Sequence, residues 1–170
     1  MPFIEALPVP KSITDNAGRV YEVIITQADF DGFDLYLFDQ KTYVGWVKCA
    51  VEARDYLILS DIVVLNEVID RRNWLSRLLD RLLRKPVPLT NYQQRGLGTQ
   101  LLQLALTCAR HKKVKTLSGW VRKKDVVQNP GLLRWYEKHG FEVIPVAGEE
   151  ITELQDTTKV ADIVLTLAKG

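Results

Sequence analysis

The sequence has no long apolar segment. No run approaches the roughly 20 apolar residues that a membrane-spanning helix needs. Residues 1–5 have neither the basic start nor the apolar body of a secretory signal peptide. With 46% hydrophobic and 26% charged residues, the composition is that of an ordinary globular chain. We therefore expect a cytoplasmic protein with one domain that covers residues 1–170.

Cysteine and histidine are also scarce, with only two of each. Cys49 and Cys108 have no Cys-x-x-Cys or His-rich partner, and both fall in segments with an apolar pattern. A small buried side chain is the interpretation that fits both cysteines. The sequence predicts no metal site.

The net charge is only +2, and the basic residues gather in one place. Residues 70–85 hold six basic residues against two acidic ones, so the basicity is local, and we expect no nucleic acid partner. The same segment has an apolar face at helical spacing, which predicts an amphipathic helix within an insertion of about residues 66–92. This face is formed by Trp74, Leu75, Leu78, Leu79, Leu82 and Leu83.

The predicted amphipathic helix has three open roles. It could cover the substrate, form a homodimer interface, or anchor the protein at a membrane surface. Membrane contact is the role that we do not expect.

Strand patterns occupy most of the remaining chain. After an irregular lead-in at residues 1–11 and a turn at 15–18, four strands follow in succession and predict a meander. The predicted strands are 19–26, 33–38, 42–51 and 56–65, followed later by 114–121, 141–145 and 161–167. The fourth strand is apolar almost throughout, which is typical of a strand covered on both faces.

A glycine-rich motif opens a predicted helix after the insertion. It reads Gln93-Gln94-Arg95-Gly96-Leu97-Gly98-Thr99 and leads into an apolar stripe that continues to Ala109. Glycine lets backbone N–H groups approach an anion closely, and the positive end of the helix dipole favours that anion. The motif predicts a phosphate-binding loop, although the same glycines could serve only as turn formers.

A second motif closes a later predicted helix. Asn129 is predicted to cap its start and Gly140 to terminate it, and the last turn reads Tyr136-Glu137-Lys138-His139-Gly140-Phe141.

The two motifs together resemble the GNAT superfamily of acyl-CoA-dependent N-acetyltransferases, which combine Gln/Arg-x-x-Gly-x-Gly/Ala with a later Tyr-Glu-x-x-Gly-Phe. The resemblance implies a mixed α/β (α+β) fold with a mostly antiparallel central sheet flanked by helices. It also implies acetyl-CoA as co-substrate, without a metal, and the amine of a small molecule or protein as acceptor.

The resemblance implies site residues as well. The amides from Gln94 to Thr99 would bind the pyrophosphate of coenzyme A, and Tyr136 would be the general acid that protonates the departing thiolate. The implied cofactor-binding residues are Ile62, Val63, Val64, Gln93, Gln94, Arg95, Gly96, Leu97, Gly98, Thr99 and Asn129. Tyr136 could instead be a core aromatic residue.

The general base is less well defined. Asp61 and Glu52 are candidates because each is a charged residue in a strongly apolar strand. Either side chain could simply face solvent. Asp61 is the stronger candidate of the two.

The sequence departs from the family pattern in two places. Only five residues separate Gln27 from Phe33, where most members carry a pair of helices that cover the acceptor. Residues 66–92 lengthen a connection that is usually short.

A dinucleotide-binding fold is rejected because Leu101 occupies the third glycine position, and no Gly-Lys-Ser/Thr supports a P-loop. A non-catalytic acyl-CoA-binding module remains an open alternative.

Overall fold

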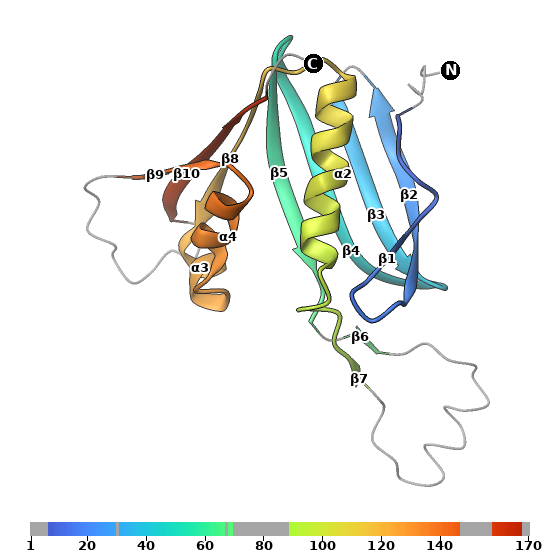
Figure 1. Cartoon of the computed structure of the whole chain (residues 1–170). Coiled ribbons are helices and arrows are strands. Elements are labelled where there is room, and N and C mark those ends of the chain that lie inside the picture. The colour runs from blue at the N-terminus through green and yellow to red at the C-terminus, as the bar shows by residue number, and fades with distance from the viewer. Residues whose placement is uncertain (1–6, 30, 67, 70–88, 147–157, 168–170) are drawn as a thin grey trace, which may run out of the picture.

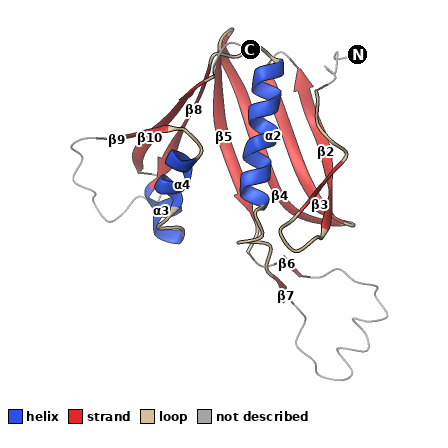
Figure 2. Ribbon diagram, viewed as in Figure 1, coloured by secondary structure: helices blue, strands red, loops and turns tan. Residues whose placement is uncertain are grey.

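The computed structural model describes residues 7–29, 31–66, 68–69, 89–146 and 158–167. Its main feature is an eight-stranded sheet with the order β1-β2-β3-β4-β5-β8-β10-β9 (Figures 1 and 2). The strands are β1 Ser12–Thr14, β2 Val20–Asp29, β3 Gly32–Asp39, β4 Thr42–Ala53, β5 Tyr56–Val64, β8 Thr116–Arg122, β9 Glu142–Pro145 and β10 Lys159–Thr166. Every pair of neighbours is antiparallel except β5 and β8, which are parallel. The predicted mixed, mostly antiparallel sheet is confirmed.

The predicted meander corresponds to strands β2 to β5. Each strand pairs with the next, and β2 and β3 are joined tightly enough that Asp29 lies opposite Gly32. This hairpin leaves no room for helices between β2 and β3. Strand β1, which the sequence analysis did not predict, extends the sheet beyond β2 and presents the turn at residues 15–18.

Helix α2, Leu97–His111, lies across β4 and β5 on one face of the sheet (Figure 1). Its predicted apolar stripe is confirmed, since the buried residues recur at helical spacing. They are Leu97, Leu101, Leu102, Leu104, Ala105, Leu106, Cys108 and Ala109. Cys49 and Cys108 are both buried, as predicted.

The start of the last helix differs from the prediction. Helix α4, Leu132–Lys138, has Gly131 and not Asn129 at its N-cap. Asn129 instead ends a short helix that was not predicted, α3 at Lys123–Gln128, because its amide donates a hydrogen bond to the Asp125 carbonyl (2.9 Å). The expected N-cap at Asn129 was therefore wrong.

The two ends of the insertion are held together by a small ladder. Strand β6, Val68–Ile69, pairs antiparallel with β7, Leu89–Thr90. The predicted amphipathic helix at residues 70–85 lies outside the described residues. Within the described ranges, no helix is long and apolar enough to cross a membrane.

Candidate active site

The candidate site lies where the parallel strands β5 and β8 separate. Their ladder pairs Tyr56 with Thr116, Leu57 with Leu117 and Ile58 with Ser118, and goes no further. Both strands continue, β5 to Val64 and β8 to Arg122. The register between β4 and β5 also shifts between Leu59 and Asp61, as at a β-bulge. Beyond Ile58, β5 therefore has a backbone edge that β8 does not pair with.

The loop of the glycine-rich motif, residues 93–96, lies beside the end of β5, and we call it the glycine loop. Gln94 and Gly96 both have positive φ, 60° and 81°, and α2 begins at the next residue. The first bond of the helix runs from the Gln100 amide to the Gly96 carbonyl (3.1 Å), so the amides of Leu97, Gly98 and Thr99 precede it. The first turn of α2 contains no acidic side chain. Such a helix start can bind an anion with backbone groups alone.

Gly98 faces the point where three elements meet. A Cβ atom at this position would lie 4.0 Å both from a methyl group of Val64 on β5 and from the Trp135 ring on α4. An alanine would therefore fit by ordinary contact, but a longer side chain would extend into the space beside the helix start. Gly98 and Val64, two of the implied cofactor-binding residues, therefore lie close together.

A buried polar network holds the glycine loop against the turn between β1 and β2. The carboxylate of Asp15 accepts hydrogen bonds from the Tyr21 hydroxyl (2.8 Å), from the amides of Ala17 and Arg19 (2.9 Å each) and from the Arg95 guanidinium (3.4 Å). The adjacent Asn16 amide donates to the Arg95 carbonyl (3.1 Å). This turn therefore fixes both the backbone and the side chain of the glycine loop.

The charge of Asp15 is stabilised by these donors. Burial alone raises the pKa of this carboxyl, but the hydrogen bonds from the Arg19 amide, Tyr21, the Ala17 amide and Arg95 outweigh burial, and the pKa is lowered. This role of Asp15 was not predicted. The only signal in the sequence was the turn composition of residues 15–18, which does not indicate what the turn contacts.

Two predicted cofactor-binding side chains are used to hold the loop. The side-chain amide of Gln93 donates a hydrogen bond to the Val64 carbonyl (3.4 Å), and its backbone amide donates one to the Asn91 side chain (2.8 Å). Arg95 donates to the Asn91 carbonyl (2.9 Å) as well as to Asp15. The geometry therefore leaves the backbone amides that follow, and not these two side chains, to contact an anion.

Trp135 connects α4 to the start of α2. Its indole N–H donates a hydrogen bond to the Thr99 hydroxyl (3.2 Å), and its carbonyl lies 2.7 Å from Nδ1 of His139. The Trp135 and Tyr136 rings meet edge to face, with centroids 4.9 Å apart. The sequence analysis gave no role to Trp135, because only the fold brings residues 99 and 135 together.

Tyr136 is the buried aromatic residue of α4, with 6% of its surface exposed. Its ring also packs against Phe141 (5.4 Å between centroids). Burial raises the pKa of Tyr136, and the charges of Asp125 and Asp61 raise it further. The phenol is therefore close enough to Asp61 to feel its charge, and it is held in the protonated form.

The two candidate bases lie in different places. Asp61 is on β5 just past the bulge, and its carboxylate accepts a hydrogen bond from the Trp46 indole (2.8 Å). Glu52 is exposed near the turn between β4 and β5, at the end of β5 away from Val64. The charge of Asp61 contributes to the raised pKa of Tyr136, whereas Glu52 is exposed to solvent. Asn129 is exposed at the junction of α3 and α4.

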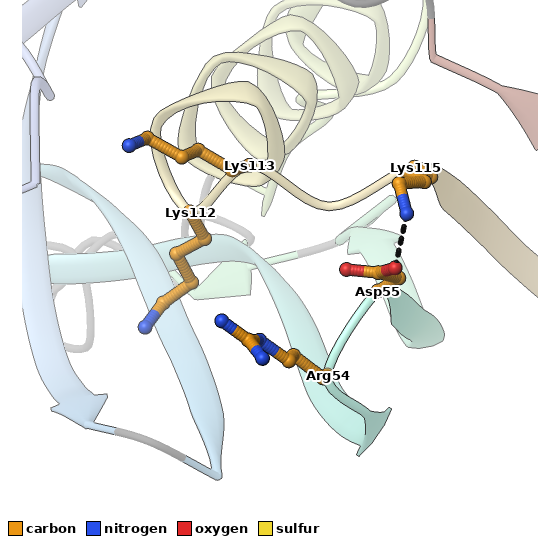
Figure 3. Close-up of a pocket in the computed structure, with 5 residues that line it drawn as sticks. All are labelled: Arg54, Asp55, Lys112, Lys113 and Lys115. Atoms are coloured by element: carbon orange, nitrogen blue, oxygen red, sulfur yellow. Dashed lines mark hydrogen bonds and ion pairs between the residues drawn. The ribbon is translucent and has the colours of Figure 1, made fainter.

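A separate hollow of about 510 Å³ lies at the other end of α2 (Figure 3). It is lined by Arg54, Asp55, Lys112, Lys113 and Lys115. Lys115 pairs with Asp55, as the dashed line in Figure 3 marks. Cations are favourable at a helix C-terminus, which explains the lysines without a ligand.

The comparisons with known proteins agree with this geometry. The model of the Acetyltransferase (GNAT) family matches residues 5–141. The chain belongs to the GNAT acetyltransferase family. Its reaction class is therefore acetyl transfer from acetyl-CoA. A search of curated protein sequences finds no match.

Solved GNAT structures share the fold at low sequence identity. The ribosomal-protein-S18-alanine N-acetyltransferase of Escherichia coli is 18% identical with a TM-score of 0.54, over 81% of this chain and 70% of that one. A GNAT acetyltransferase of Elizabethkingia anophelis with acetyl-CoA bound is 17% identical with a TM-score of 0.52, over 81% and 77%. The PaiA N-acetyltransferase of Thermoplasma acidophilum in complex with coenzyme A is 17% identical with a TM-score of 0.51, over 81% and 62%. At these identities the similarity shows the fold alone.

Proposed function

We propose that the protein is an N-acetyltransferase that moves the acetyl group of acetyl-CoA to a primary amine in one direct step. The observation that carries the proposal is the separation of β5 from β8 beyond Ile58, with the glycine loop beside the end of β5. The backbone edge of β5 at Ile62 to Val64, which β8 does not pair with, suits the amide groups of the pantetheine arm, although the Val64 carbonyl already accepts a hydrogen bond from Gln93. The amides of Leu97, Gly98 and Thr99 suit its pyrophosphate. The bound coenzyme A and acetyl-CoA of two structural neighbours support this choice of co-substrate.

The proposed reaction assigns one proton transfer to each of two residues. The acceptor arrives as an ammonium ion and gives a proton to Asp61, directly or through water. The neutral nitrogen forms a bond to the thioester carbon, and the bond from that carbon to sulfur breaks. Tyr136 protonates the leaving thiolate, and the second proton lost by the nitrogen returns through solvent to Tyr136.

The raised pKa of Tyr136 supports its role as a proton donor. An unperturbed tyrosine ionises near pH ~10, and a higher pKa keeps the phenol protonated over the whole neutral range. We therefore expect no loss of turnover from ionisation of Tyr136 as the pH rises from 8 to about 10.

Thiol release from acetyl-CoA in the presence of an amine panel tests the proposal. Tyr136→Phe keeps the ring contacts with Trp135 and Phe141 and removes the proton, so turnover should fall about 100-fold with little change in acetyl-CoA affinity. Tyr56→Phe, at the far end of β5, is the matched control and should leave turnover unchanged. Tight acetyl-CoA binding without thiol release from any amine would instead support the non-catalytic module.

A further inference from the structure

The face of the sheet opposite α2 carries a group of half-buried aromatic rings. Along β3, Phe33, Leu35 and Leu37 are buried on the α2 side, and the alternate residues are only partly buried. Four rings from β3 and β4 gather on this opposite face, and we call them the aromatic surface. They are Tyr36, Phe38, Tyr43 and Trp46.

The rings of the aromatic surface contact one another closely. Tyr43 and Trp46 are stacked, with centroids 5.2 Å apart and planes inclined by 12°. The Tyr43 centroid is also 5.6 Å from that of Tyr36 and 5.8 Å from that of Phe38. Faces of aromatic rings that remain accessible attract cations, because the ring quadrupole is negative above and below the plane.

One cation of the chain already uses this surface. Lys48 lies between Asp34 on β3 and Asp61 on β5 in the register of the sheet. Its ammonium is 3.8 Å from the Asp34 carboxylate and 5.9 Å from the centroid of the Tyr36 ring. The combination of ring face and carboxylate therefore holds an alkylammonium group on the Asp34 side.

The Asp61 side also has a ring and a carboxylate, and Lys48 and Arg122 feel the charge of Asp61, but their ion pairs are with Asp34 and Asp125. The Trp46 indole fixes the Asp61 carboxylate (2.8 Å), and within the described ranges no Lys, Arg or His forms an ion pair with it. Burial first, and then the charges of neighbours that include Asp61, raise the pKa of Tyr43 to about 12. Asp61 thus lies within electrostatic reach of both the aromatic surface and Tyr136.

We propose that the aromatic surface and Asp61 bind the acceptor, and that this acceptor is an alkylammonium group on an extended aliphatic stem. The stem lies along the Tyr43–Trp46 stack, and the ammonium lies beside Asp61, where it loses its proton. This inference rests on the proposed function, because it names the acceptor class of the same site. Free alkylamines and lysine side chains share this chemistry.

Three monocationic probes test the stem. The probes are n-pentylamine, Nα-acetyllysine amide and methylamine. The two long probes should be acetylated with a kcat/KM about tenfold above that of methylamine, as expected if about two methylene groups of the stem are buried against the rings. Turnover of n-pentylamine alone would identify a free alkylamine as the acceptor, and turnover of Nα-acetyllysine amide alone would identify a lysine side chain. Equal kcat/KM for all three would overturn the inference.

Substitution of Tyr43 tests the surface separately. Tyr43→Leu should raise the KM for the preferred long amine about tenfold, with kcat and acetyl-CoA affinity unchanged. Tyr43→Phe keeps the ring, so its KM for the same amine should stay well below that of Tyr43→Leu. If Tyr43→Leu leaves the KM unchanged while melting temperature and acetyl-CoA binding are normal, the aromatic surface is not the acceptor site.

Calorimetric titration with the two long probes separates this inference from the proposed function. Binding that is lost in Tyr43→Leu, without thiol release in the wild type, would support the ligand class and contradict the acetyl transfer. Thiol release from methylamine without binding of either long probe would support the acetyl transfer and contradict the ligand class.

Discussion

The two faces of the sheet are built differently around the point where β5 and β8 separate. On the α2 face, the glycine loop is held by a buried network in which Asp15 accepts hydrogen bonds from two turn amides, from Tyr21 on β2 and from Arg95 in the loop. On the opposite face, Tyr36, Tyr43 and Trp46 are only partly buried and contact one another through their rings.

The two faces therefore control different properties. An anion site made of backbone amides works only if the loop keeps its shape, so its supporting residues also contribute to stability. Half-buried rings contribute less to folding than fully buried ones, and their side-chain conformations can adjust to a ligand. Substitutions on the α2 face should alter stability and acetyl-CoA affinity together, and substitutions on the opposite face should alter only acceptor kinetics.

The largest expected effect comes from Gly98→Glu. The new side chain would extend from a position 4.0 Å from Val64 and Trp135, and its carboxylate would repel a pyrophosphate at the helix start. We expect acetyl-CoA binding to be lost, as measured by calorimetry, in a protein that still melts cooperatively. Gly98→Ala is the matched control, because a Cβ atom fits there without a close contact. Normal binding of acetyl-CoA by Gly98→Glu would show that the start of α2 is not the anion site.

A smaller effect on both properties is expected for Asp15→Asn. Loss of the charged acceptor should lower the free energy of unfolding by about 2 kcal/mol. Because the network also holds Arg95, we expect acetyl-CoA affinity to fall about tenfold. This corresponds to a loss of about 1.4 kcal/mol in the binding free energy. Asp55→Asn, at the other end of α2, should leave acetyl-CoA affinity unchanged.

The effect of Asp15→Asn should depend on pH. The pKa of Asp15 is lowered in the folded protein, so its contribution is present above the unfolded pKa near ~3.9 and is lost as the pH falls through the folded value. The difference in unfolding free energy between wild type and variant should therefore shrink in acid. A constant difference down to the lowest accessible pH would show that the Asp15 charge does not stabilise the turn.

Most of the fold could be predicted from the sequence, because its elements follow local patterns. Strands β2 to β5 alternate or run apolar, and α2 has a continuous apolar stripe, so both were predicted within a few residues. The start of α4 was not, because Asn129 and Pro130 also suit the end of a preceding short helix. β1 has only three residues and is defined by its pairing with β2, which no local pattern indicates.

Only the part of the candidate site that is formed by backbone groups could be predicted from the sequence. The glycine motif indicated a helix start open to an anion, and the structure has this geometry at Gly96 and Gly98. The Asp15 network, the Trp46 contact with Asp61 and the Trp135 contact with Thr99 join residues that lie far apart in the chain. The sequence offers no spacing rule for such contacts.

The smallest expected effect concerns the bond between Trp135 and Thr99, which joins α4 to the α2 face of the site. Trp135→Phe and Thr99→Val should each lower the free energy of unfolding by about 1 kcal/mol, the usual net value of one hydrogen bond. The double variant should be less destabilised than the sum of the two, because each single change already removes the bond. Chemical denaturation of the four proteins measures this coupling. Strict additivity would show that the 3.2 Å contact does not stabilise the fold, and the two helices would then be held only by packing of the Trp135 ring near Gly98.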